Sequence, residues 1–311
     1  MKKTRRHKKT IKRYLRVVIG ILLLIMLTLT ERYLSFEDKD ASFAFKSNSG
    51  SNIADGELKA HFIDVGQADC ILFQADDQSL LIDAGNNEDA DTIVTYLREQ
   101  GINKLDYVIG THPHEDHIGS LDTVIHNFDI GVVLMPNKVH TSKTFEDVLD
   151  AIEEKNLSIT EPVVGDEYQL GEAVFTIVAP NRDYEDDLNN WSIGIKVAYR
   201  NNIFLLCGDI EKEAELDIIK NGIHIAADVL KVSHHGSKTS TSAEFLKAVN
   251  PAYAVISVGK DNSYDHPSDQ TLQRLNENGV EIFRTDELGT IIAISDGTTI
   301  TWKWSKDETD N

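Results

Sequence analysis

The residues with the clearest chemical potential are His112, His114, Asp116 and His117, four potential metal ligands within six positions. Imidazole nitrogens and carboxylate oxygens bind Zn²⁺ and related divalent ions at about 2.0 to 2.2 Å. The spacing H-x-H-x-D-H directly follows an apolar, strand-like run, and this combination is far more specific than an isolated pair of histidines. We predict that His112 and His114 face one ion, and that Asp116 and His117 face a second ion nearby.

Alternating strand-like and helix-like runs surround this motif, and their order indicates a layered α/β domain over residues 58–304, with a solvated tail over 305–311. Cys70 and Cys207 each lie in an apolar strand-like run, so we interpret them as buried core residues, and a disulfide is not indicated. The helix-like runs are 89–102 and 144–156. The strand-like runs are 61–65, 70–74, 79–85, 105–112, 131–136, 172–180, 191–200, 202–209, 228–236, 252–259 and 291–304.

The N-terminus has the composition of a targeting segment. Residues 1–16 contain nine Lys and Arg and no acidic residue, and an uncharged apolar run of 14 residues follows. Residues 17–34 therefore predict a signal anchor or a signal peptide, because the run is shorter than the roughly 20 residues that span a bilayer comfortably. No small-x-small cleavage site follows directly, which favours an uncleaved anchor over a secreted protein. The basic residues predict that the domain, joined by a polar linker over 35–57, lies outside the cell.

The rest of the chain is strongly acidic. The whole sequence has a net charge of -20, and beyond the first sixteen residues 22 basic side chains face 51 acidic ones. Such a surface repels polyanions at long range, which disfavours tight non-specific binding of DNA. Bound metal ions, or a local mouth formed by Lys231, Lys238 and Lys260, would be needed to reverse that field.

Further segments make the resemblance to a known family clear. Together with the histidine motif, Asp83 in SLLIDAG, Asp209 in IFLLCGD and the pair in LKVSHHGS resemble the metallo-β-lactamase superfamily. That resemblance implies a four-layer αββα sandwich with metals at one edge of its two sheets. It also implies that Asp209 touches both metals, and that either His234 or His235 completes the second site.

One expected ligand is missing. Where many members of the superfamily supply a third histidine for the first metal, this chain has NNWSIGIKV, which includes Asn190 and Ser192. Asparagine is a poor Zn²⁺ ligand, so the first site is expected to bind metal weakly, to recruit water, or to prefer an ion such as Mn²⁺. We therefore predict two divalent ions, Zn²⁺ or Mn²⁺.

Four segments resemble one branch of the superfamily, the extracytoplasmic hydrolase domain of the competence protein ComEC, in a stand-alone form. They are HFIDVGQADCILFQ, NNWSIGIKV, LKVSHHGSKTS and YDHPSDQTLQRL, and the resemblance spans roughly residues 58–298. In that branch an Asn-x-Ser segment stands in place of the third histidine. The departure therefore does not imply an inactive enzyme.

The resemblance and the residue types also suggest roles around the metals. Asp116, Asp209 and His266 are predicted to act in catalysis, with His266 protonating the leaving oxygen or contacting phosphate. Residues predicted to orient the metal-binding imidazoles are Asp64, Asp69, Asp83 and Asn190, with turn-capping as the alternative role of the carboxylates. Residues predicted to contact substrate are Ser192, Ser237, Lys238, Thr239 and His266.

Three classes of function fit these features. The first is a metal-dependent phosphodiesterase that cleaves DNA, or alternatively a phosphocholine ester or another cell-wall polymer. The second is hydrolysis of a lactam, lactone or thioester on the same fold. The third is a tethered binding module that has lost turnover, for which the missing third histidine is the support. Membrane association through the N-terminal segment is expected, and no stable protein partner is inferred.

Overall fold

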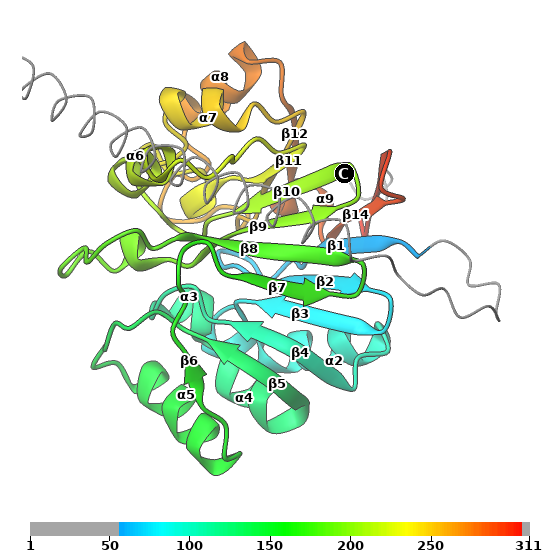
Figure 1. The fold of residues 1–311 in the computed structure, drawn as a ribbon, viewed down its shortest axis with the longest axis vertical. Coiled ribbons are helices and arrows are strands. Elements are labelled where there is room, and N and C mark those ends of the chain that lie inside the picture. The colour runs from blue at the N-terminus through cyan, green and yellow to red at the C-terminus, as the bar shows by residue number, and fades with distance from the viewer. Residues whose placement is uncertain (1–55, 307–311) are drawn as a thin grey trace, which may run out of the picture. The chain divides into compact units, whose positions relative to one another are not determined.

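The computed structural model describes residues 56–306, and the strands of this part form two sheets (Figure 1). One has eight strands in the order β15-β14-β1-β2-β3-β4-β5-β6, and the other has seven in the order β13-β12-β11-β10-β9-β8-β7. The strands of the first sheet are β1 (Leu58–Phe62), β2 (Ile71–Ala75), β3 (Gln78–Ile82), β4 (Lys104–Ile109), β5 (Asp129–Leu134), β6 (Ile159–Thr160), β14 (Ile291–Ser295) and β15 (Ile300–Trp304). Those of the second are β7 (Glu167–Leu170), β8 (Ala173–Ala179), β9 (Gly194–Tyr199), β10 (Asn202–Leu206), β11 (Val229–Lys231), β12 (Tyr253–Ile256) and β13 (Glu281–Arg284).

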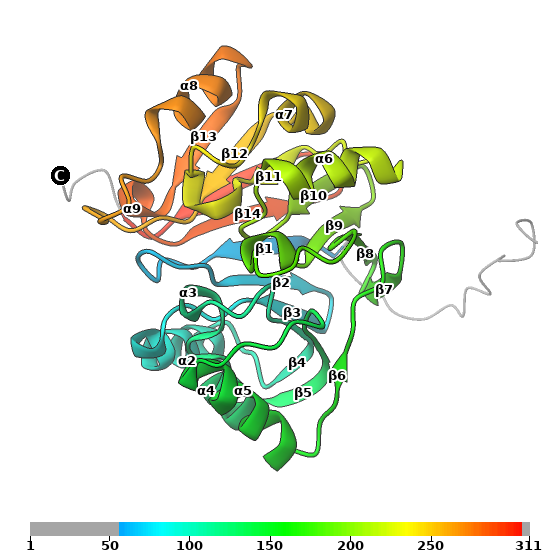
Figure 2. The same ribbon diagram turned by 90° about the vertical axis from the view of Figure 1, so that its left-hand side faces the viewer.

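Helices cover the outer face of each sheet, which gives four layers (Figure 2). Buried residues of α2, α4 and α5 pack on the first sheet, and those of α6, α7 and α8 pack on the second. The predicted αββα sandwich is thus confirmed. The helices are η1 (Asn87–Asp89), α2 (Ala90–Glu99), α3 (Glu115–Ile118), α4 (Leu121–Asn127), α5 (Lys143–Glu154), η2 (Asn189–Trp191), α6 (Lys212–Asn221), η3 (Ser233–Gly236), α7 (Ala243–Val249), α8 (Asp269–Glu277) and α9 (Thr285–Leu288).

Alternation along the strands fills three separate cores. In β11, Val229 faces the core between the sheets, whereas Leu230 faces the helices of the outer layer. Cys70 and Cys207 are buried free thiols in the two outer cores, as predicted. Each fully buried Leu, Val or Phe contributes about 1.5 to 3 kcal/mol relative to an exposed side chain, so these cores stabilise the sandwich.

Helix α5 shows how sequence spacing orients an outer helix. The Ser142 hydroxyl caps its N-terminus by accepting a hydrogen bond from the Phe145 amide at 3.2 Å. Phe145, Val148 and Ile152 follow at intervals of three and four, and all three are buried against the sheet. The predicted helix over 144–156 therefore has its apolar stripe on the inner face.

A close backbone contact joins the loop after β3 to the turn that contains the histidine motif. The amide of Ala84 donates to the carbonyl of His117 at 2.7 Å, and the amide of Gly119 donates to the carbonyl of Gly85 at 2.8 Å. A Cβ atom on Gly119 would lie 2.2 Å from the carbonyl carbon of Asn86, so no side chain fits there. Glycine at this position lets the two loops meet behind the histidine motif.

The predicted signal anchor at 17–34 and most of the predicted linker lie outside the described residues. Within residues 56–306, none of the helices has the length and apolar character needed to cross a bilayer. The first strand begins at Leu58 and the last ends at Trp304.

The contact at Gly119 generates a stability prediction. We expect Gly119→Ala to lower the free energy of unfolding by about 3 kcal/mol, because the added methyl group overlaps backbone that cannot move independently. Gly101→Ala is the control: its φ is +77° but nothing lies within 4 Å of the new Cβ, so its cost should be about 1 kcal/mol. Denaturant unfolding followed by circular dichroism measures both. Equal losses would contradict the steric argument.

Candidate metal centre

Strand ends from both sheets bring the predicted ligands to one edge of the sandwich. His112 and His114 follow β4, and α3 carries Asp116 and His117. Residues from the other sheet approach the same edge: Asp209 follows β10, and the second histidine pair lies in η3 after β11. Because parallel strands end at the same side of their sheet, segments distant in sequence meet here.

Two buried imidazole rings each form a hydrogen bond through Nδ1, which leaves Nε2 directed at the other candidate ligands. His117 Nδ1 lies 2.7 Å from Asp83 Oδ2, and His235 Nδ1 lies 2.9 Å from the carbonyl oxygen of Ser257. The predicted contact between Asp83 and a ligand imidazole is thus present. These bonds fix both rings so that each Nε2 atom faces the other candidate ligands.

His112 is held in the same way, but by hydroxyl groups. Its Nδ1 lies 3.2 Å from the Oγ1 of Thr111 and 3.2 Å from the Oγ of Ser192, while its Nε2 lies 2.9 Å from His114 Nδ1. The Ser192 hydroxyl also accepts a hydrogen bond from the Asp209 amide at 3.0 Å. Because Ser192 has no exposed surface, the prediction that it contacts substrate is wrong. It positions His112 and Asp209 instead.

The atoms that face one another in this cluster fit a divalent cation. One nitrogen or oxygen from each of Asp116, His117, Asp209 and His235 lies within 4.8 Å of the others. Among the described residues, His117 Nε2, His235 Nε2 and Asp209 Oδ1 are buried without a hydrogen-bond partner. Leaving buried polar atoms unpaired costs roughly 1 to 3 kcal/mol each, so their clustering calls for a ligand. Two imidazoles and two carboxylates are donors suited to Zn²⁺ or Mn²⁺.

The electrostatics of the cluster also call for positive charge. Burial alone would raise the pKa of Asp209, but the rings of His117 and His235 hold it well below its ordinary value. Burial would lower the pKa of His117, but Asp209, Asp83 and Asp116 raise it well above its ordinary value. Without a cation, the carboxylates therefore keep a proton on His117, and a divalent ion would take the place of that proton.

The adjacent histidines of η3 point to different places. His235 is buried, with its Nε2 3.3 Å from Asp116 Oδ2, whereas the His234 side chain is 23% exposed and its Nδ1 lies 3.6 Å from Glu211 Oε1. Both residues adopt left-handed backbone with φ near +50°, at 52° and 50°. Such strain in non-glycine residues is typical of functional sites. The geometry favours His235 as the ligand, with His234 at the rim.

A cavity of about 300 Å³ opens over the cluster, and His234 and His266 both line it. Burial, followed by the positive charge of His234 and His235, lowers the pKa of His266 to about 4. His266 is therefore a neutral imidazole at neutral pH and can donate one hydrogen bond into the cavity. Its ring stacks on Tyr264, with the ring centres 5.8 Å apart.

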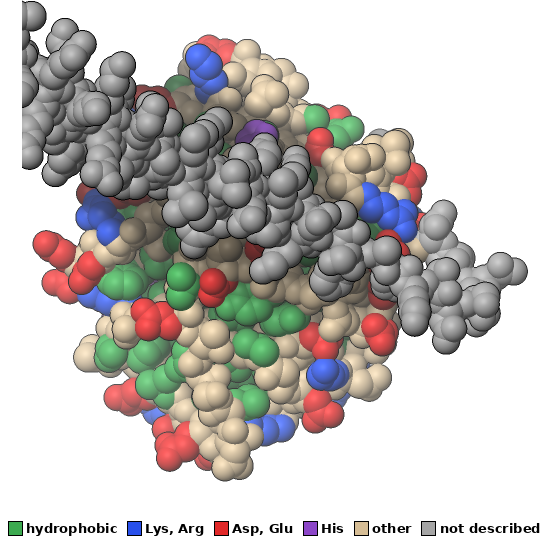
Figure 3. Space-filling model, viewed as in Figure 1, with side chains coloured by type: hydrophobic (Ala, Val, Ile, Leu, Met, Phe, Trp, Pro, Cys, Tyr) green, Lys and Arg blue, Asp and Glu red, His purple; other side chains and the backbone are tan. Residues whose placement is uncertain are grey.

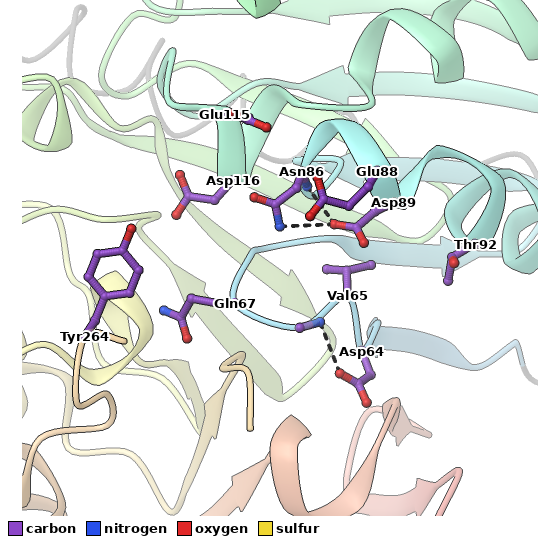
Figure 4. Close-up of a pocket in the computed structure, with 11 residues that line it drawn as sticks. Asp64, Val65, Gln67, Asn86, Glu88, Asp89, Thr92, Glu115, Asp116 and Tyr264 are labelled. Atoms are coloured by element: carbon purple, nitrogen blue, oxygen red, sulfur yellow. Dashed lines mark hydrogen bonds between the residues drawn. The ribbon is translucent and has the colours of Figure 1, made fainter. Parts of the chain in front are cut away.

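A wider hollow of about 650 Å³ adjoins this cavity, and its rim is acidic (Figure 4). Gln67, Asp116 and Tyr264 each border both spaces. The other acidic residues that line the hollow are Asp64, Glu88, Asp89 and Glu115. A ligand that extends from the cluster in this direction therefore meets negative charge.

Several predicted contacts are not present. Asp64 accepts a hydrogen bond from the Gly66 amide at 3.3 Å and lies 3.5 Å from Lys306 Nζ, so the prediction that it orients an imidazole is wrong. Lys238 borders a separate hollow beside the start of α8. Lys231 is 1% exposed and therefore does not belong to a positive mouth.

The hydroxyls after the histidine pair hold the rim rather than face the cavity. Ser237 Oγ lies 2.9 Å from Thr239 Oγ1, which donates to Glu211 Oε1 at 3.1 Å. Thr239 thus contacts Glu211, Ser237 contacts Thr239, and neither residue lines the cavity, so the predicted direct contact of both with substrate is not present. Asn190 likewise contacts none of the imidazoles, because its side-chain oxygen accepts the Glu211 amide at 2.8 Å. Glu211 was missed from sequence, where an acidic residue after Asp209 carries no distinguishing signal.

Comparison with known proteins agrees with this geometry. The family model of the metallo-β-lactamase superfamily matches residues 63–260. The chain belongs to this superfamily of metal-dependent hydrolases. The metallo-β-lactamase-fold protein YhfI from Bacillus subtilis has a TM-score of 0.53 at 12% identity, covering 77% of this chain and 100% of YhfI, which supports the fold alone.

Curated relatives confirm the resemblance to ComEC-type competence proteins. The chain is 32% identical over 253 residues to ComE operon protein 3 of Bacillus subtilis, which covers 76% of this chain and 33% of that protein. It is 28% identical over 249 residues to competence protein ComA of Neisseria gonorrhoeae, covering 79% of this chain and 34% of the relative. The chain thus spans about a third of the length of these relatives.

The different orientations of the paired histidines give a matched test. We expect His235→Ala to lower the affinity for Zn²⁺ or Mn²⁺ at least about hundredfold, because it removes a candidate ligand. His234→Ala should leave the metal content of the purified protein unchanged. Elemental analysis and chelator competition measure both variants. Loss of metal from His234→Ala with retention in His235→Ala would reverse the assignment.

Proposed function

We propose that this domain is an extracytoplasmic metal-dependent phosphodiesterase, and that DNA is its substrate. The observation that carries the hydrolytic function is the cluster of buried ligand atoms of His117, Asp209 and His235, which face one another beneath an open cavity. A strained, desolvated group of ligands without a catalytic role would be costly to maintain. A catalytic role in hydrolysis would account for a site that is costly to fold.

The proposed ligands for two divalent ions, Zn²⁺ or Mn²⁺, divide between the two histidine groups. His112 and His114 would hold the first ion, His117 and His235 would hold the second, and Asp209 would contact both. Asp116 lies beside His235 and His117 and joins the second set. Asn189, in the NNWSIGIKV segment that stands in place of the third histidine, lines the cavity, so the first site would favour an oxygen-tolerant ion such as Mn²⁺.

Bound divalent ions would supply two kinds of chemistry: they would lower the pKa of water toward about 7 and neutralise phosphodiester oxygens. The chain itself orients the substrate. His266, neutral at the cavity wall, donates a hydrogen bond to a phosphate or leaving-group oxygen. His234, beside Glu211, adds a second donor at the rim. The buried rings exclude bulk water from the inner side of the site.

Similarity to competence proteins supports DNA as the substrate. The acidic rim of the adjoining hollow opposes a polyanion on that side, so a DNA strand would approach across His234 and His266 instead. Binding of DNA should therefore be weak and sensitive to salt.

The acidic hollow favours a second candidate, an esterase acting on a cell-wall phosphodiester that carries a positive group such as choline. Tyr264 is 67% exposed and lines the same hollow as the carboxylates of Asp64 and Glu115, and an aromatic ring with carboxylates suits a quaternary ammonium. Hydrolysis of a lactam or lactone has no comparable support in the site. A binding module without turnover is disfavoured by the complete second ligand set.

The chemistry generates a kinetic prediction. We expect Asp209→Ala to reduce kcat at least about a thousandfold, because it removes transition-state stabilisation shared by both ions. Lys238→Ala, a surface change in a separate hollow, should alter neither kcat nor KM appreciably. Turnover assays with single- and double-stranded DNA, a phosphocholine ester and a β-lactam, each with Zn²⁺ and with Mn²⁺, provide the measurement. Intact DNA alongside hydrolysis of the phosphocholine ester or the lactam would remove DNA from the proposal.

The proposed location outside the cell rests on the basic segment over 1–16 and the apolar run after it. We expect protease added to intact cells to digest the domain, because it would face outward from a single-pass anchor. A cytoplasmic marker protein is the control for cell integrity. Protection in intact cells with digestion only after lysis would contradict the proposed topology.

A further inference from the structure

A lysine is buried directly beneath the candidate metal centre. Lys231 ends β11, and it faces the same side of the second sheet as Val229, toward the core between the sheets. It is 1% exposed, and its Nζ lies 2.7 Å from Asp69 Oδ2, a carboxylate that is also 1% exposed. Burying an ion pair costs free energy for the desolvation of each ion before the attraction is counted, so packing alone does not account for this lysine.

Asp69 connects the lysine to the proposed ligands. Its Oδ1 lies 3.7 Å from His235 Nδ1, and its Oδ2 lies 4.0 Å from His117 Nδ1. Its amide donates to the carbonyl of Asp116 at 3.0 Å, so the same residue also holds the backbone of the histidine motif. The pair of Lys231 and Asp69 therefore lies against three of the proposed ligands.

Little room remains for solvent around this pair. A cavity of about 10 Å³ lies between Lys231, Asp69 and Asp83, and the rest of its wall is formed by Thr111, Gly208 and apolar residues of both sheets. A space of that size holds one water at most. Water therefore has little room to solvate Asp69 beside the lysine.

The sum of the charges near the imidazoles suggests a function for the pair of Lys231 and Asp69. Among the described residues, four carboxylates lie within 4.0 Å of His117 or His235, namely Asp69, Asp83, Asp116 and Asp209. Their four negative charges would cancel two divalent cations completely. With the ammonium of Lys231 included, these four carboxylates and two divalent ions sum to one net positive charge. A phosphodiester has one negative charge.

We propose that Lys231 is a positioning residue that neutralises Asp69, so that the metal-loaded centre remains positive and attracts an anionic phosphodiester. This inference rests on the proposed function. It assigns to Lys231 a role in substrate affinity although the side chain does not reach the cavity. It also explains why one acidic residue near the ligands has a buried cationic partner.

The test compares three changes of charge in the full chain loaded with Zn²⁺ or Mn²⁺. Lys231→Met removes one positive charge, Asp69→Asn removes one negative charge, and the double variant leaves the total unchanged. Inorganic phosphate is the probe, and its affinity is measured by calorimetry. Chelator competition measures the metal affinity of each variant separately. Lys196→Met is the matched control, because Lys196 lies in β9 of the same sheet and its Nζ donates to the carbonyl of His224 at 3.0 Å.

We expect Lys231→Met to bind phosphate about tenfold more weakly without losing metal affinity, and Asp69→Asn to bind it about tenfold more tightly. The double variant should stay within about twofold of the natural protein, because its net charge is restored. A purely structural lysine predicts the opposite for the double variant, which would then be as weak as Lys231→Met or weaker.

Unchanged phosphate affinity in Lys231→Met, or a double variant that remains weak, would overturn the proposal. If Lys231→Met does not fold, Asp69→Asn and the double variant still decide it, since unchanged or weaker phosphate binding by Asp69→Asn contradicts the charge argument. Phosphate binding requires no turnover. The expected order of affinities without hydrolysis of any phosphodiester would therefore refute the proposed function and leave the role of Lys231 intact.

Discussion

The concentration of carboxylates around two buried imidazoles is the constraint on which the site depends. His117 lies between Asp83 at 2.7 Å and Asp209 at 3.2 Å, and its side chain is fully buried. Negative charges cannot be buried together at such density without compensation. Protonation of His117, the ammonium of Lys231 and a bound cation are the available sources of positive charge. Protonated His117 and Lys231 belong to the chain itself. A bound cation would in addition supply the chemistry of hydrolysis.

The surrounding fold compensates part of this negative charge by supplying hydrogen-bond donors on the side of the carboxylates away from the cavity. Backbone and hydroxyl groups hold Asp83, which accepts from the Thr111 amide and hydroxyl, both at 2.8 Å. Gly119 permits the loop after β3 to approach the histidine motif. These contacts join the segments that follow β3 and β4 in the first sheet, so the integrity of that sheet and the geometry of the centre are coupled. A change that separates the loops should weaken both stability and metal binding.

The sequence predicted the parts of the site that are local. The motif from His112 to His117 lies in one turn, so its spacing alone indicates convergence, and the alternation of strands and helices indicates the layered fold. His234 and His235 could not be separated, because their different directions follow from two left-handed backbone conformations that residue type does not predict. Ser192 appeared as a substrate contact because hydroxyls after a loop are often exposed. Only tertiary packing shows that it is buried.

The positions of charged residues in the sequence also did not predict which of them face the metal centre. Lys231 was counted among residues of a positive mouth, since lysines are rarely buried, yet its position at the end of a central strand directs it inward. Asp64 and Asp69 occur in the same turn and have the same chemistry, but Asp69 faces the imidazoles and Asp64 faces Lys306. The direction in which each side chain points, rather than its residue type, determines the different roles of Asp64 and Asp69.

The central claim is that the facing ligand atoms of His117, Asp209 and His235 hold divalent ions. Anomalous X-ray scattering from crystals grown with Zn²⁺ or Mn²⁺ tests it most directly. The account predicts anomalous peaks at the edge of the sandwich, about 2.0 to 2.2 Å from His117 Nε2, His235 Nε2 and a carboxylate oxygen of Asp209. Peaks only elsewhere on the molecule, with those three atoms bonded to one another or to water, would contradict it.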